Sequence, residues 1–323
     1  MKKLNIKGII FDYGGTLDTK GDHWSEVLWK TYLRFGLGVE EGGLCSAAVD
    51  VAADHNAAFD VAAAPAGASA IAGKSIHKQA FRDAYVYAER ALAVNPIVKP
   101  KFHFIDILRE KFILELSYLA GLPLLPTGKD DAEKQAAWKN EQDKQKAERE
   151  RGCEAHKNLF GVEESVDVFL KLDEAQVKAL AQDMANYTND VTNALLQKNR
   201  AVLERLHKAR IPMVLVSNFY GNINQVLKDA GLKGYFKQVI ESAVVGVRKP
   251  NPAIFALGVC ALDLPASQVL VVGDTYGKDI VPAHQLGCHT LWIKGLQWED
   301  KEYDESLPDG IIENLSEMEE YVL

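Results

Sequence analysis

Residues 8–21 read GIIFDYGGTLDTKG, and this stretch decides the fold. The apolar run over residues 4–11 is typical of a strand that is buried on both faces. The run ends in Asp12, and two glycines and Thr16 follow at once. Because glycine lets the backbone come close to a ligand, this strand end can hold a carboxylate beside a phosphate-sized anion.

Further apolar runs of this kind lie in the C-terminal part of the chain, and helical patterns separate them. They cover residues 211–218, 236–242, 269–274 and 289–293. This alternation predicts βαβ units and an α/β fold with a doubly wound parallel sheet. Ligands bind at the carboxyl ends of the strands in such sheets. Asp12, Ser217 and Asp274 each end one of the runs, so we expect them to converge on one edge.

A long segment without a strong strand signal separates the first strand from the second. Its helical patterns cover residues 22–37, 80–93, 104–120 and 173–208. Asp173 and Gln176 predict a capping box for the last helix. We therefore expect an inserted, mainly α-helical cap domain over residues 21–199, with the core formed by residues 1–20 and 200–323.

Two parts of the inserted segment have unusual compositions. Residues 43–73 are rich in alanine, and residues 128–157 are densely charged. A solvated helix or a loop is the ordinary interpretation of the charged part. The sequence predicts neither the order nor the role of these two parts.

Length and composition indicate a globular protein of two domains. The chain has 323 residues, 47% hydrophobic residues and a net charge of −8. The charge argues against nucleic acid as a partner, and no apolar stretch approaches the roughly 20 residues that span a bilayer. The N-terminal apolar run is too short for a signal peptide, and the four cysteines are scattered. We therefore expect free thiols and a cytoplasmic location. The oligomeric state stays open.

Several residues at the predicted sheet edge suit phosphate chemistry. A carboxylate on a rigid strand end, such as Asp12, can attack phosphorus. The amides of Gly15 and Thr16 can cradle phosphoryl oxygens. Ser217 offers a hydroxyl group, and Lys249 in GVRKPNP offers a positive charge. Together these residues predict a phosphate site.

Asp274 and Asp279 in GDTYGKD add hard oxygen ligands to the same edge. Mg²⁺ prefers carboxylate oxygens and water. Carboxylates gathered around Asp12 without a cation would raise one another's pKa values. The cluster therefore predicts a Mg²⁺ site, provided that the fold brings the three side chains together.

The order of these pieces resembles that of the haloacid dehalogenase (HAD) superfamily. FDYGGTLD resembles its first motif, VLVSN its second, Lys249 its third, and GDTYGKDI its fourth in the form GDxxxxD. The resemblance covers residues 4–18 and about 200–295. It implies a HAD-like Rossmannoid core with an enlarged helical cap of the first type.

The resemblance also implies roles for residues. Asp12 would be the nucleophile that forms an aspartyl-phosphate. The residues that would hold the phosphate are Ser217, Lys249, Gly15, Thr16 and Asn218. Mg²⁺ would be held by Asp12, the backbone carbonyl of Gly14, Asp274 and Asp279.

Gly14 departs from the pattern of the superfamily's phosphatases, which carry a second aspartate at this place as general acid and base. Glycine has no side chain for that task, and the loss typically costs 10²–10⁴ in rate. Asp18 and His23 are candidate surrogates, because the chain passes from the core to the cap there. Alternatively, His23 caps the helix that follows, and water supplies the proton.

Three functions fit these observations. The first is a Mg²⁺-dependent phosphohydrolase acting on a small phosphorylated metabolite. The second is a phosphonatase-like C–P hydrolase that uses a cap lysine such as Lys20 or Lys30. The third is a non-catalytic protein that binds Mg²⁺ or a phosphorylated ligand, which Gly14 favours and the retained Asp12 opposes. The sequence does not identify the substrate.

Overall fold

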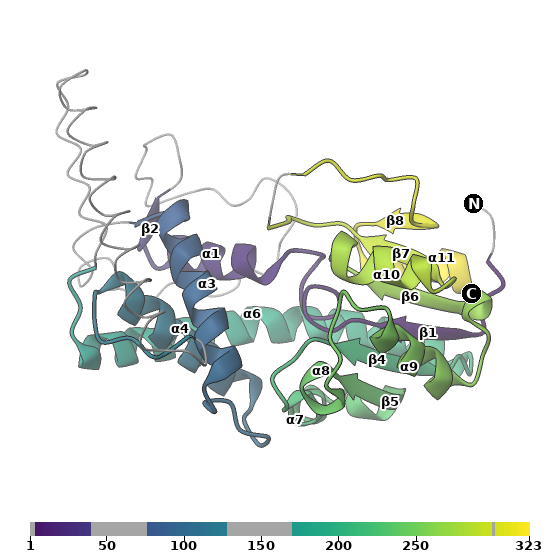
Figure 1. Cartoon of the computed structure of the whole chain (residues 1–323), viewed down its shortest axis with the longest axis horizontal. Coiled ribbons are helices and arrows are strands. Elements are labelled where there is room, and N and C mark those ends of the chain that lie inside the picture. The colour runs from purple at the N-terminus through teal and green to yellow at the C-terminus, as the bar shows by residue number, and fades with distance from the viewer. Residues whose placement is uncertain (1–3, 40–75, 128–169, 299–300) are drawn as a thin grey trace.

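The structure, a computed structural model, describes residues 4–39, 76–127, 170–298 and 301–323. In this part of the chain, a core built on a parallel sheet carries a mainly helical cap (Figure 1). The predicted fold class is therefore confirmed. The segments 43–73 and 128–157 lie outside the described residues.

The core sheet has six strands in the order β5-β4-β1-β6-β7-β8, and every pair is parallel. The strands are β1 (Gly8–Phe11), β4 (Met213–Ser217), β5 (Phe236–Glu241), β6 (Val269–Gly273), β7 (His289–Ile293) and β8 (Gly310–Ile312). The sequence predicted all of them except β8, which is an edge strand of three residues. Such a short run carries too few apolar residues to be recognised.

Helices cover both faces of the sheet, as expected for a doubly wound fold. Ile9 and Phe11 of β1 pack with α6 (Glu174–Lys208), α7 (Ile223–Asp229) and the C-terminal helices η4 (Leu315–Met318) and α11 (Glu319–Val322). Ile10 points to the other face, which holds α9 (Ala253–Leu262) and α10 (Val281–Gln285). The remaining short helices of the core are α8 (Ser242–Val245), η1 (Lys233–Tyr235), η2 (Ala266–Gln268) and the π-helical turn η3 (Tyr276–Ile280).

The cap has a hydrophobic core of its own. Its described elements are α1 (Trp24–Arg34), α3 (Lys78–Val94), α4 (Phe104–Leu119), the N-terminal part of α6, and the two-residue strands β2 (Gly38–Val39) and β3 (Ile76–His77). Tyr32, Phe81 and Phe112 are fully buried where α1, α3 and α4 meet. The apolar stripes that predicted these helices therefore face one another.

Helix α6 belongs to both parts. It has 35 residues and begins with the predicted capping box between Asp173 and Gln176. Its residues up to Val191 pack in the cap, whereas residues from Leu196 onward pack in the core (Figure 1). The proposed domain boundary at residues 199 and 200 therefore falls inside one continuous helix. Asn199 also donates to the Leu17 carbonyl at 2.8 Å, which ties α6 to the loop after β1.

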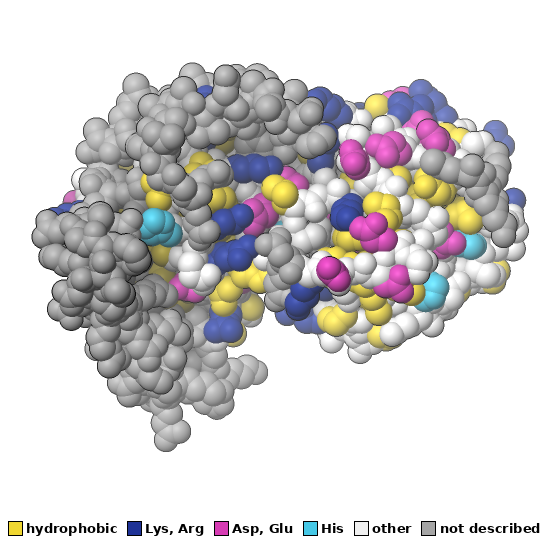
Figure 2. Space-filling model, turned by 90° about the horizontal axis from the view of Figure 1, so that it is seen from above, with side chains coloured by type: hydrophobic (Ala, Val, Ile, Leu, Met, Phe, Trp, Pro, Cys, Tyr) yellow, Lys and Arg dark blue, Asp and Glu magenta, His cyan; other side chains and the backbone are white. Residues whose placement is uncertain are grey.

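Among the described helices, none combines the length and apolar character needed to cross a membrane. In the view of Figure 2, dark-blue Lys and Arg side chains are interspersed with magenta Asp and Glu side chains over the cap and the core. Ion pairs lie in the cap region: for example, Lys78 bonds to Glu26 at 2.5 Å, and Lys30 bonds to Asp22 at 2.7 Å.

Candidate functional site

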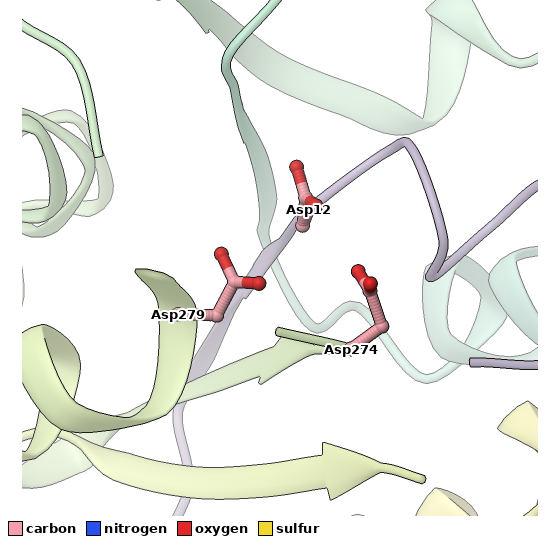
Figure 3. A group of neighbouring side chains, drawn as sticks. All are labelled: Asp12, Asp274 and Asp279. Carbon is pink, nitrogen blue, oxygen red and sulfur yellow. The ribbon is translucent and has the colours of Figure 1, made fainter. Parts of the chain in front are cut away.

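Three carboxylates converge at the carboxyl edge of the central strands. Asp12 follows β1, Asp274 follows the neighbouring β6, and Asp279 lies in the π-helical turn η3. The Asp12 amide continues the ladder by donating to Val272 at 3.0 Å, so the two strand ends are level. One oxygen from each carboxylate lies within 4.8 Å of the others, and Figure 3 shows the three groups facing a common space. The predicted convergence of these side chains is present in the structure.

Lys249 joins this cluster. Its Nζ lies 2.7 Å from Oδ1 of Asp12 and 2.7 Å from Oδ1 of Asp279, and its side chain is buried. Asn218 holds the backbone of Lys249, accepting from its N–H at 2.9 Å and donating to its carbonyl at 3.1 Å. In this structure Asn218 therefore positions Lys249, while its predicted contact with phosphate stays a prediction.

The cluster carries more negative charge than one lysine can balance. Burial raises the pKa of Asp12, although Lys249 opposes this effect. Burial and the charges of Asp279 and Asp12 raise the pKa of Asp274 well above its usual range. Burial alone would lower the pKa of Lys249, but Asp12 and Asp279 raise it. Three buried carboxylates around one space fit a divalent cation with hard oxygen ligands, because the ion would offset this repulsion.

The turn after Asp12 is shaped around Asp274. Gly15 has a φ of +94°, and a Cβ atom there would lie 2.2 Å from Cγ of Asp274. Thr16 Oγ1 donates to Asp274 Oδ1 at 3.1 Å. The Gly15 amide donates to Asp18 and the Thr16 amide to the Tyr13 carbonyl, so phosphate contacts of these two amides would have to replace those bonds.

Gly14 faces an indole ring. A Cβ atom at Gly14 would lie 3.4 Å from Nε1 of Trp24, which is ordinary contact. Trp24 Nε1 donates to Asp18 Oδ2 at 3.2 Å, and the Gly15 amide donates to Asp18 Oδ1 at 2.7 Å. Burial raises the pKa of Asp18 to about 8, against the Gly15 hydrogen bond and with help from the Asp12 charge. Asp18 therefore holds a proton at neutral pH.

His23 is the N-cap residue of α1, the alternative that the sequence left open. Its Nδ1 accepts from the Ser25 amide at 3.2 Å. Burial lowers the pKa of His23 to about 4, and Lys278 adds to the shift. The imidazole is therefore neutral at neutral pH. Its ring packs against Tyr85 and Trp298.

Ser217 ends β4 and is buried. Because β4 pairs with β1, with Phe11 opposite Leu215, Ser217 extends the same edge that carries Asp12. Its predicted role at the phosphate stays a prediction. Lys30, one of the two cap lysines considered for a C–P hydrolase, forms an ion pair with Asp22.

The sequence prediction missed two buried charged residues of the cap. Lys111 and Glu115 are buried on α4, beside the apolar side chains Leu108 and Phe112. Lys111 bonds to Glu89 of α3. The one signal in the sequence was the placement of two charged residues along an apolar stripe, which argues for a buried polar group.

Comparisons with known proteins agree with this geometry. The chain matches the family model of haloacid dehalogenase-like hydrolases over residues 6–287. It is 30% identical over 118 residues to a phosphoserine phosphatase of Thermus thermophilus, covering 36% of this chain and 47% of that protein. It is 29% identical over 163 residues to haloacid dehalogenase-like hydrolase domain-containing protein 3 of Xenopus laevis, covering 49% and 64%.

A third relative is a phosphoglycolate phosphatase of Vibrio parahaemolyticus, 30% identical over 124 residues, covering 38% of this chain and 54% of that protein. The matched regions thus span about half to two thirds of these relatives.

Proposed function

Because the chain belongs to the haloacid dehalogenase-like hydrolases, we propose that it is a Mg²⁺-dependent phosphohydrolase of small phosphorylated metabolites. One observation supports this most strongly. The Lys249 ammonium lies 2.7 Å from both Asp12 and Asp279, within a cluster whose carboxylate oxygens lie within 4.8 Å of one another. The proposed nucleophile, a buried ammonium group and the proposed metal ligands therefore lie next to one another.

In the proposed reaction, a carboxylate oxygen of Asp12 forms a bond to phosphorus. The bond from phosphorus to the leaving oxygen breaks, and its electron pair stays on that oxygen. Water then attacks phosphorus in the aspartyl-phosphate, which releases inorganic phosphate and restores the Asp12 carboxylate. Lys249 and Ser217 hold the phosphoryl oxygens by charge and hydrogen bonding.

The metal ligands in this proposal are Asp12, Asp274, Asp279 and the Gly14 carbonyl. When bound there, Mg²⁺ supplies positive charge beside the phosphoryl oxygens. The rigid strand end, the hydrogen bond from Thr16 to Asp274 and the absence of a side chain at Gly15 keep the ligands in place.

The leaving oxygen also needs a proton when it departs as an alkoxide. Of the two candidate surrogates, Asp18 holds a proton at neutral pH because its pKa is about 8, whereas His23, with a pKa of about 4, does not. Asp18 is therefore the candidate that we favour as the proton source near Gly14.

The test is release of inorganic phosphate from a panel of phosphomonoesters, including p-nitrophenyl phosphate, with Mg²⁺ or with a chelator. We expect activity only with Mg²⁺, and a loss of at least about 10³-fold in Asp12→Asn, because removal of a nucleophile abolishes the covalent route. Asp263→Asn is the matched control, since Asp263 is exposed at the end of α9 and Asn tolerates its left-handed backbone.

Two results would contradict the proposal. The first is an Asp12→Asn variant as active as the wild type. The second is a folded wild-type protein that binds Mg²⁺ and releases phosphate from no substrate, which would favour the non-catalytic alternative.

A further inference from the structure

A second group of polar side chains forms where the cap meets the core. Glu89 comes from α3, Lys111 from α4, and Tyr220 from the loop that follows β4. Lys111 Nζ donates to Oε1 of Glu89. The Tyr220 hydroxyl lies 3.0 and 3.1 Å from the two oxygens of Glu89. The Glu89 carboxylate of α3 thus bonds to one side chain of α4 and to one side chain of a core loop.

The core member of this group, Tyr220, follows β4, the strand that ends in Ser217. Tyr220 is only three residues beyond Ser217 in the chain. The ring of Tyr85 lies 3.9 Å from Lys111 Nζ. Burial and Glu89 raise the pKa of Tyr85, and the Asp274 carboxylate contributes to the same shift. Tyr85 is therefore within electrostatic reach of both the Glu89 group and the carboxylate cluster.

The group offers a ligand an acceptor and not a cation. The Lys111 side chain is only 6% exposed, and its ammonium lies between Glu89 and the face of Tyr85. The Glu89 side chain keeps 36% of its surface exposed. Although burial raises the pKa of Glu89, Lys111 and Tyr220 bring it below the ordinary value, so Glu89 stays ionised.

Three other cations, Arg82, Lys278 and Arg248, lie around the Glu89 group. Arg82 stacks over Trp298 and pairs with Glu26. Lys278 lowers the pKa of His23, and Arg248 lowers that of Tyr220. The described structure has none of these cations bonded to Glu89.

Aromatic rings stand next to the Glu89 group. The ring centroids of Tyr85 and Trp298 are 5.3 Å apart, and His23 lies 6.0 Å from Tyr85 and 5.4 Å from Trp298. Because His23 is neutral, it adds apolar surface without charge. Ring surface beside an ionised acceptor suits a carbon skeleton that carries hydroxyl groups. A second carboxylate would be repelled there.

We infer that Glu89 accepts hydrogen bonds from hydroxyl groups of the substrate's leaving group, an inference that rests on the proposed phosphohydrolase function. The substrate is then a phosphorylated polyol or sugar, and phosphorylated carboxylic acids are poor substrates. A substrate carboxylate in the place of that hydroxyl group would be repelled by the charge of Glu89 and could donate no hydrogen bond to it, so Glu89 should discriminate between the two kinds of substrate.

The test compares matched substrates that differ in one group. Glycerol 3-phosphate and 3-phosphoglycerate form the short pair, and glucitol 6-phosphate and 6-phosphogluconate form the long pair. We expect wild-type kcat/KM to favour the polyol at least tenfold in at least one pair. Glu89→Gln should lower this ratio at least tenfold, and Tyr220→Phe should lower it less, because it removes only one partner of Glu89. Glu204→Gln, an exposed change on α6, should leave the ratio unchanged.

A preference of the wild type for the acids would overturn the inference, as would wild-type ratios in both Glu89→Gln and Tyr220→Phe. If Glu89→Gln does not fold, the inference is judged by the substrate preference of the wild type and by the kcat/KM ratio of Tyr220→Phe. Release of phosphate from any substrate of the panel separates the proposed phosphohydrolase from the role of Glu89. If the wild type releases phosphate from no substrate, the proposed phosphohydrolase is contradicted, whereas release with unchanged ratios contradicts only the role of Glu89.

Discussion

Replacing Gly14 by aspartate should add a general acid and base at the place where the sequence resemblance expects a second aspartate. The backbone accepts the change, because Gly14 is not among the residues with positive φ. The new Cβ would lie 3.4 and 3.5 Å from atoms of the Trp24 indole, which is ordinary contact. The new carboxyl group would stand beside Trp24 Nε1, which now donates to Asp18.

The rise in kcat that Gly14→Asp produces depends on how much the leaving group needs a proton. General acid–base catalysis contributes typically about 10²–10⁴-fold, or roughly 3–5 kcal/mol of barrier. The new carboxyl group has to share the Trp24 donor with Asp18, so we expect kcat for alkyl phosphates to rise at least tenfold. Hydrolysis of p-nitrophenyl phosphate should change much less, because its leaving group departs without a proton. Steady-state kinetics on both substrates measures the ratio of kcat for the alkyl phosphate to kcat for p-nitrophenyl phosphate.

Gly14→Ala is the matched control, since it adds the same Cβ without the carboxyl group. A Gly14→Asp variant that is folded and binds Mg²⁺, but has the same alkyl-to-aryl ratio as Gly14→Ala, would refute the reasoning. Either Asp18 would then already supply the proton as well as the new carboxyl group can, or proton transfer would not limit the reaction.

Two further predictions concern buried carboxyl groups. Asp18→Asn should lower kcat for alkyl phosphates tenfold or more and affect p-nitrophenyl phosphate far less; equal losses would mean that Asp18 only supports the loop through Gly15 and Trp24. Burial raises the pKa of Glu115 from 4.5 to about 8; Lys111 and Tyr32 lower this pKa, and the charge of Glu89 raises it. The folded wild type therefore loses stability as pH rises from about 4.5 to 8, because the unfolded chain ionises Glu115 more easily. The loss is roughly 5 kcal/mol at most, from about 3.5 pKa units, and the neutral side chain of Glu115→Gln avoids it. Thermal unfolding from pH 5 to 8 should therefore show a growing advantage of that variant, and a constant difference would contradict the assignment.

Local pattern was enough to predict five of the six strands of the core sheet and the edge where the three carboxylates converge. An apolar run that ends in a polar residue marks both a buried strand and its carboxyl end, so the sequence by itself placed Asp12 and Asp274 together. The capping box at Asp173 was equally local.

Contacts between distant segments could not be predicted in this way. The two hydrogen bonds between Asn218 and the backbone of Lys249 depend on how two loops approach each other. The meeting of Glu89 with Tyr220 depends on how the cap sits on the core. His23 had two interpretations from sequence, and only its bond from Ser25 shows that it caps α1.

The continuous helix α6 has a mechanical consequence. Thirty-five residues at about 1.5 Å per residue make a rod of about 52 Å, anchored at one end among cap side chains and at the other among core side chains. The other crossing, at Gly21, is held by close backbone contact with Gly295. The two lobes therefore cannot separate along the axis of this rod, and a change in their relative position would be a tilt about the rod or a bend in it.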